Sequence, residues 1–169
     1  AHAHEKLWAQ LDTSYFLRHD APEIAWHTRL LNYRVDTSTP VVKARLSPAG
    51  EGVQILIYAP DQKGLFARIC SFFERINFNI VEAKIYTTRH AYALDSFLVM
   101  DAGGEAARYR DLLSFIEYEL GERLKRQTPL EPPLQGRVSR QLKHFPITPE
   151  VQLQPDERGN CHVLSIVAG

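Results

Sequence analysis

The stretch Ala59–Cys70, "APDQKGLFARIC", lies where two regular elements of different periodicity meet. Residues 53–59 before it, VQILIYA, are apolar and rich in β-branched side chains, which predicts a strand near the centre of a sheet. After Gly64, apolar residues recur three and four positions apart, which predicts a helix with one buried face. These residues are Leu65, Ile69, Phe72, Phe73 and Ile76. The stretch therefore predicts a strand, a short loop at residues 60–64 and a helix.

Two more strands and a second helix follow this unit. Residues 79–88 and 91–101 have strand-like patterns with a turn at Thr88-Arg89-His90, so we expect them to form a hairpin. Residues 105–126 predict a long helix, and Val151–Leu153 predict a strand that closes the unit. The order β-α-β-β-α-β predicts an α+β fold, the ferredoxin-like plait, with a four-stranded antiparallel sheet and both helices on one face.

A helical lead-in precedes the plait. Residues 5–32 contain short apolar stripes, and Pro22 is compatible with the first turn of a second helix. Residues 32–40 are polar and rich in turn-forming types, which predicts a connection. Residues 41–46 can form a further short strand before a turn at 47–52.

The chain contains an internal repeat. Residues 40–59 align without gaps with residues 149–168, an offset of 109 that brings Pro40 onto Pro149 and Gly50 onto Gly159. Both segments predict a strand, a turn and a strand. We therefore expect a second copy of the module to begin near residue 149 and to be truncated, because the sequence stops before the counterpart of Asp61.

Composition excludes two classes of partner. Lys plus Arg and Asp plus Glu number 20 each, so the chain lacks the basic excess with which nucleic-acid-binding proteins neutralise phosphates. No apolar run approaches the roughly 18 residues that a membrane-spanning helix needs.

The two cysteines, Cys70 and Cys161, are expected to be buried free thiols, which suits a reducing compartment and predicts a cytoplasmic protein. Since the chain opens without Met, we expect it to be a piece of a longer protein.

The loop at residues 60–65 is the candidate binding site. The first N–H groups of a helix have no intrahelical partner and lie at the positive end of its dipole, so a carboxylate or phosphate can dock there. Gly64 would let a ligand approach the backbone, and Asp61 could accept a hydrogen bond from an ammonium group. An amino acid carries both charges and fits this pair. The alternative is an ordinary capped turn between a strand and a helix.

Two motifs resemble those of the ACT domain family. Asp61-Gln62-Lys63-Gly64-Leu65 follows an apolar strand, and Asn79-Ile80 opens the next strand. ACT domains are small regulatory modules with this plait, which commonly pair and bind amino acids between two copies. The resemblance implies ligand contacts at Asp61, Gly64, Leu65, Asn79 and Ile80, and it implies self-association through module pairing.

Longer motifs resemble bacterial bifunctional uridylyltransferase/uridylyl-removing enzymes that act on the signal protein PII. They are "YFLRH" (15–19), "IAWHTRLL" (24–31), "GLFARICSFF" (64–73), "NIVEAKIYTT" (79–88) and "ALDSFLVMD" (93–101). In that family a nucleotidyltransferase domain and an HD hydrolase domain precede two ACT modules that sense glutamine in nitrogen regulation.

The resemblance implies a domain organisation. Residues 1–39 would be a helical linker after an HD domain absent from this chain, residues 40–154 an ACT domain, and residues 155–169 the start of a truncated second one whose first hairpin begins near residue 149. The chain itself would be regulatory and not an enzyme. The parent protein would transfer UMP to PII and remove it as a phosphodiesterase, with Mg²⁺ in its catalytic domains.

The sequence provides no catalytic or metal-binding set of its own. Arg18-His19-Asp20 contains the letters His-Asp but lacks the other spaced ligands that a metal site requires. We therefore expect no catalytic residue, metal or cofactor in this chain.

Two other functions fit parts of the pattern. A structural dimerisation plait would use Asp61 and Gly64 for assembly without binding a ligand, and an incomplete second module would leave a strand edge that invites pairing between chains. An ACT module of a formyltetrahydrofolate deformylase would have a similar Asp-Gln-Lys-Gly loop. That module would stand at the start of its protein, whereas here helices precede it and a repeat follows.

Overall fold

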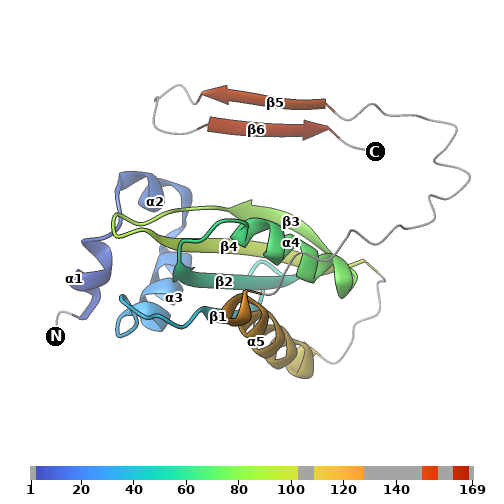
Figure 1. Ribbon diagram of the computed structural model, residues 1–169, viewed down its shortest axis with the longest axis horizontal. Coiled ribbons are helices and arrows are strands. Elements are labelled where there is room, and N and C mark those ends of the chain that lie inside the picture. Colours follow the sequence, from blue (N-terminus) through green and yellow to red (C-terminus); the bar gives the residue numbers. More distant parts are fainter. Residues whose placement is uncertain (1–2, 103–108, 128–149, 156–161, 168–169) are drawn as a thin grey trace, which may run out of the picture. The chain divides into compact units, whose positions relative to one another are not determined.

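The computed structural model describes residues 3–102, 109–127, 150–155 and 162–167 (Figure 1). The chain forms two compact units, residues 1–133 and 134–169, which are described separately. The helices of the first unit are α1 (Ala3–Trp8), α2 (Thr13–Arg18), α3 (Ala21–Leu31), α4 (Leu65–Arg75) and α5 (Tyr109–Arg126). Its strands are β1 (Val41–Leu46), β2 (Val53–Pro60), β3 (Phe78–Lys84) and β4 (Tyr92–Asp101). The second unit contains β5 (Glu150–Pro155) and β6 (His162–Val167).

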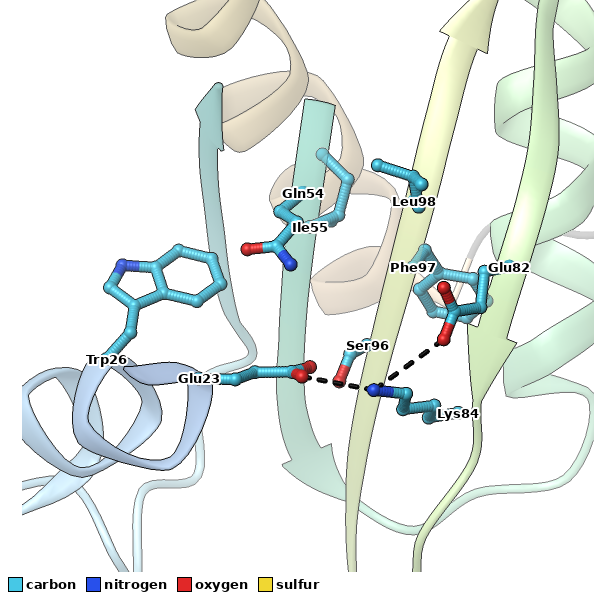
Figure 2. A pocket seen from close by; sticks show the side chains of 9 residues that line it. All are labelled: Glu23, Trp26, Gln54, Ile55, Glu82, Lys84, Ser96, Phe97 and Leu98. Atoms are coloured by element: carbon cyan, nitrogen blue, oxygen red, sulfur yellow. Dashed lines mark hydrogen bonds and ion pairs between the residues drawn. The ribbon is translucent and has the colours of Figure 1, made fainter. Parts of the chain in front are cut away.

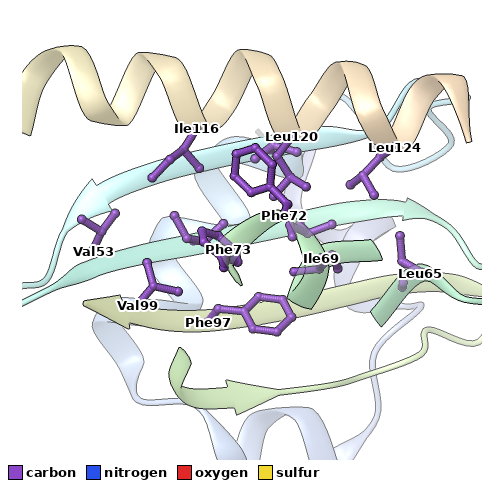
Figure 3. Packing of buried hydrophobic residues seen from close by; sticks show 14 residues of the cluster. Val53, Leu65, Ile69, Phe72, Phe73, Phe97, Val99, Ile116, Leu120 and Leu124 are labelled. Atoms are coloured by element: carbon purple, nitrogen blue, oxygen red, sulfur yellow. The ribbon is translucent and has the colours of Figure 1, made fainter. Parts of the chain in front are cut away.

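The first unit is built on a four-stranded antiparallel sheet in the order β1-β2-β4-β3. Helices α4 and α5 pack on one face of it, and Figure 3 shows their apolar side chains meeting those of the central strands. This core is formed by Val42, Val53, Ile55, Ile57, Leu65, Ile69, Phe72, Phe73, Ala93, Phe97, Val99, Ile116, Leu120 and Leu124. The predicted α+β plait, with an antiparallel sheet and both helices on one face, is confirmed.

The predicted closing strand is wrong. Val151–Leu153 belong to β5, which pairs with β6 in a separate two-stranded sheet, and the edge position beside β2 is taken by β1. The local turn explains this result, because the Ser47 N–H donates to the Gly52 carbonyl oxygen at 2.9 Å and joins β1 to β2 through six residues. Closing such a short hairpin costs less chain entropy than returning a strand from beyond residue 127.

The β5–β6 hairpin reproduces the register of the β1–β2 hairpin. Val42 pairs with Ile57 and, 109 residues later, Val151 pairs with Ile166. Every other pair in the two hairpins is shifted by the same 109 residues. The expected pair of strands in each repeat is therefore confirmed, while the turn at residues 156–161 lies outside the described residues. A complete second module and the domain boundaries remain predictions.

The lead-in forms a third layer on the other face of the sheet. Helical structure predicted over residues 5–32 is confirmed as three helices, α2 capped by Asp12 and α3 by Asp20. A second core joins lead-in and sheet through Leu7, Leu11, Tyr15, Leu31, Val35, Val41, Leu56, Tyr58, Tyr86 and Leu94. Both faces of β2 are therefore buried, which explains why its sequence is apolar at nearly every position.

Some strands and helices begin or end at residues other than the predicted ones. Strand β3 ends at Lys84, so the predicted strand 79–88 is too long, whereas the turn at residues 88–90 is confirmed. Residues 105–108 of the predicted second helix, like Cys161, lie outside the described residues. Cys70 is a half-buried free thiol, and burial raises its pKa. In the part of the chain that the structure describes, no helix is long and apolar enough to cross a membrane.

Candidate functional site: the loop between β2 and α4

The ligand loop, residues 60–64, joins the end of β2 to the start of α4. Gly64 is the N-cap of α4 and has φ +78°, in the left-handed region. A Cβ added there would meet only the Arg68 guanidinium at 3.8 Å, so conformation and not space requires glycine. No side chain caps the helix. The first turn of α4 therefore carries no side-chain cap at the positive end of the helix dipole, and the ordinary turn that binds no ligand stays the alternative prediction.

Asp61 is held by its backbone and leaves its side chain exposed. Its N–H donates to the carbonyl oxygen of Ala91 at 2.9 Å, which fixes the loop to the turn between β3 and β4. Its carboxylate makes no hydrogen bond or ion pair with any residue that the structure describes. The carboxylate is thus available to accept a hydrogen bond from a cation beside the helix terminus.

Gln62 adds a polar atom that the sequence did not single out. Its Oε1 is shielded from solvent and has no hydrogen-bond partner among the described residues. A shielded acceptor without a donor costs free energy, so a donor supplied by a ligand or by water would be favourable here. No sequence pattern marks this residue, because a glutamine in a loop is usually solvated.

Asp95 is a second carboxylate that sequence reasoning missed. It lies on β4, only 2% exposed, and accepts a hydrogen bond from the Tyr86 N–H at 3.3 Å. Burial, with a smaller contribution from the charge of Asp61, raises the pKa of its carboxyl to about 7. A lone aspartate within the apolar run ALDSFLVM was the signal that could have found it. Because burial favours the protonated form of Asp95, the negative charge available to a cation at this end of the sheet is that of Asp61.

Leu65 belongs to the core and not to a binding surface. Its side chain is 4% exposed and belongs to the apolar cluster between α4 and the sheet, together with Ile69 and Phe97 (Figure 3). The Leu65 N–H donates to the Gln62 carbonyl oxygen at 3.3 Å. Leu65 can therefore position the helix terminus, but its side chain does not face a ligand.

Asn79 and Ile80 lie at the opposite end of the sheet from Asp61. Ile80 pairs with Val99, whereas Ala59 pairs with Ala93, and β2 and β3 run parallel because both are antiparallel to β4. Six residues along a strand span about 20 Å. One module therefore does not bring the two predicted groups of site residues together, and a ligand that touches both groups needs a second copy.

A separate polar cluster lies between α3 and the sheet. Glu23 on α3 pairs with Lys84 on β3 at 3.1 Å, and Lys84 also lies 3.6 Å from Glu82 (Figure 2). The small pocket beside them holds about 30 Å³, room for a water molecule and not for an organic ligand. Burial lowers the pKa of the neighbouring His27 to about 3. Among the described residues no group of three His, Cys, Asp or Glu is placed to hold a metal ion.

Comparisons with known proteins agree with this geometry. Residues 53–117 match the family model "ACT domain", and residues 1–30 match "Uridylyltransferase GlnD fifth domain". The plait and its loop therefore define an ACT domain.

Similarity extends well beyond the plait. Proteins described as bifunctional uridylyltransferase/uridylyl-removing enzymes are 55% identical over 99% of the chain in Ralstonia nicotianae, 56% over 96% in Chromobacterium violaceum and 57% over 96% in Cupriavidus pinatubonensis. The chain covers 19–20% of their length, so it spans about a fifth of these relatives. No solved structure gives a significant match. The chain belongs to the ACT domain region of the bifunctional uridylyltransferase/uridylyl-removing enzyme family.

Proposed function

We propose that this chain is a regulatory module that senses an amino acid, with glutamine as its effector. The observation that carries the proposal is the left-handed Gly64 at the uncapped start of α4, beside the exposed carboxylate of Asp61. The backbone N–H groups of the first helical turn suit the α-carboxylate of an amino acid. Asp61 suits its ammonium group, and Gln62 can accept a hydrogen bond from an amide.

The ligand is held between two modules. Asn79 and Ile80 lie about 20 Å along the sheet from the loop, so they contact the ligand of a paired module. The shared register of the β1–β2 and β5–β6 hairpins supports a second module that begins near Glu150. Self-association of separate chains would provide the same pairing.

The parent protein of this module is a cytoplasmic enzyme that transfers UMP to PII and removes it. Its catalytic domains, with Mg²⁺, lie outside this chain, which supplies only regulation. By linkage, glutamine favours the uridylyl-removing state only if it binds that state more tightly than the transferase state.

Calorimetric titration with glutamine tests the proposal. The chain is compared with a version extended through the second module, and glutamate serves as the control ligand. We expect binding of glutamine to the extended protein and weak or absent binding to the present chain, since the proposed ligand lies between two complete modules. A folded, extended protein that binds no glutamine would overturn the proposal and favour a structural dimerisation plait.

A further inference from the structure

The turn Thr88–Ala91 between β3 and β4 is bonded both to the ligand loop and to the lead-in. The Asp61 N–H donates to the Ala91 carbonyl oxygen at 2.9 Å, and the Arg89 N–H donates to the Gln10 carbonyl oxygen at 2.9 Å. Both are bonds between backbone groups, so they constrain three chain segments directly and do not depend on side-chain rotamers. The turn is thus a hydrogen-bonded bridge between the loop and the segment that follows α1.

His90 extends this bridge to the connection between α3 and β1. Its Nε2 lies 3.0 Å from the Val35 carbonyl oxygen. Because a carbonyl oxygen only accepts, Nε2 carries the hydrogen and Nδ1 accepts from the Thr88 hydroxyl at 2.8 Å. The imidazole also stacks on Tyr92, with ring centroids 4.3 Å apart. Movement of the turn therefore displaces both the start and the end of the lead-in.

Ala91 holds the turn in an unfavourable conformation. Its φ of +63° lies in the left-handed region, which residues other than glycine rarely adopt. Such a conformation persists only where surrounding bonds hold it. Within the turn, the Ala91 N–H donates to the Thr88 carbonyl oxygen at 3.1 Å, the Thr88 N–H donates to the Tyr92 carbonyl oxygen at 2.8 Å, and the Tyr92 N–H donates to the Thr88 hydroxyl at 2.9 Å. The bond from the Asp61 N–H to the Ala91 carbonyl oxygen comes from outside the turn, so its loss removes the external restraint on the strained residue.

We propose that the Thr88–Ala91 turn transmits the state of the ligand loop to the lead-in helices. When the backbone at Asp61 moves, its bond to Ala91 changes, the turn shifts, and the bonds at Gln10 and Val35 change with it. The coupling is reciprocal, so displacement of the lead-in alters the loop. This inference rests on the proposed function only for the identity of the ligand that moves the loop.

Amide hydrogen exchange in two matched glycine variants of the chain, without ligand, tests the coupling. Gly64→Ala strains the loop at φ +78°, and Gly50→Ala strains the β1–β2 turn at φ +120°, with no heavy atom within 4 Å of the added Cβ at Gly50 and none closer than 3.8 Å at Gly64. Both changes add strain without a clash. The Arg89 amide donates to the Gln10 carbonyl oxygen, and the Asp12 amide donates at 2.9 Å to the hydroxyl of Tyr86, two residues before the turn. We expect Gly64→Ala to accelerate exchange of these two amides about fivefold or more relative to Gly50→Ala.

The Leu56 amide, fully buried in β2 between β1 and β4, reports global unfolding and serves as the internal reference. Equal acceleration of the Arg89 and Asp12 amides in both variants, after this correction, would overturn the proposal. So would faster exchange at Asp61 alone in Gly64→Ala. A lack of response to added glutamine would count against the proposed function and not against this coupling, because the glycine comparison needs no ligand.

Discussion

Glu23 of α3 and Lys84 of β3 form an ion pair, with 3.1 Å between Oε2 and Nζ, in the layer between the lead-in and the sheet (Figure 2). The Glu23 side chain is 8% exposed. The Nε2 atoms of His19 and His27 lie 3.9 and 3.8 Å from its other oxygen, but burial lowers the pKa of both imidazoles. Lys84 is therefore the main compensation for the Glu23 charge.

Replacing Lys84 with methionine should destabilise the fold by roughly 2 kcal/mol, because it keeps the apolar stem and leaves a buried carboxylate without its cation. Urea denaturation measures the free energy of unfolding. Lys6→Met is the matched control, since the pair of Lys6 with Asp36 is exposed on both sides and should contribute nothing measurable. Equal losses in the two variants would show that the Glu23–Lys84 pair has no special role.

Asp95 should make the free energy of unfolding fall as the pH rises. Burial raises the pKa of its carboxyl to about 7 from an ordinary value of 3.8. The folded state therefore keeps a proton that the unfolded state releases, and stability present below about pH 4 is lost as the pH rises toward 7. Asp95→Asn retains an oxygen for the Tyr86 N–H and should stabilise the protein by a few kcal/mol at most near pH 8. The gain should be much smaller near pH 4, and a gain independent of pH would contradict this account.

His27 should make the free energy of unfolding rise with pH, opposite to Asp95, over an overlapping pH range. Burial, with the charges of His19, Arg45 and Lys84, lowers its pKa from 6.5 to about 3. The unfolded state binds a proton that the folded state does not, so stability present above about pH 6.5 is lost as the pH falls toward 3. His27→Asn keeps an acceptor for the Tyr15 hydroxyl and should flatten this loss. Chemical denaturation from pH 4 to 8 checks it, and a curve parallel to that of the wild type would refute it.

The plait and its loop could be predicted because their signals are local. The apolar run of residues 53–59 is set by burial on both faces of β2, and the three-and-four spacing from Leu65 to Ile76 is set by burial on one face of α4. The conformation of Gly64 follows from the same logic, since few residues other than glycine suit the start of α4. The register of β5 and β6 was visible as an internal repeat.

The remaining features depend on contacts distant in sequence. The sheet edge beside β2 is occupied by β1 and not by Val151–Leu153. A strand joined to β2 by a short turn competes there with a strand that must return from much later in the chain, and no pattern within either segment reveals the outcome. Asn79 and Asp61 belong to one predicted site, yet only the strand register shows them at opposite ends of the sheet. In the sequence, Asp95 resembles an exposed residue on the solvent face of a half-buried strand. Only the structure shows that the lead-in and α4 cover the two faces of the sheet, so that Asp95 is buried.

Removal of the lead-in should unfold or aggregate the plait, although the sequence suggested a linker. Deleting residues 1–39 exposes the apolar face formed by Leu56, Tyr58 and Leu94, which the lead-in buries. Size-exclusion chromatography and thermal unfolding of residues 40–169 measure the effect. A monomeric fragment with the melting temperature of the whole chain would show that the lead-in is only a linker.

Tyr58→Phe in the whole chain is a milder test of the same contact. Loss of the hydrogen bond from the Tyr58 hydroxyl to the Val35 carbonyl oxygen should lower the free energy of unfolding by about 1 kcal/mol.

Asp61→Asn should weaken glutamine binding by about tenfold in the chain extended through the second module. The change removes the negative charge that faces the ammonium group and keeps the size of the side chain, and a charge-assisted hydrogen bond is worth roughly 1.5 kcal/mol or more. Asp111→Asn, at an exposed position of α5, makes the same change of charge away from the loop and should leave the affinity unchanged. Calorimetric titration of both variants separates a direct contact from a general charge effect. Equal losses would assign the effect to net charge, and unchanged affinity in Asp61→Asn would remove Asp61 from the site while leaving the helix terminus at Gly64 to be tested by its alanine variant.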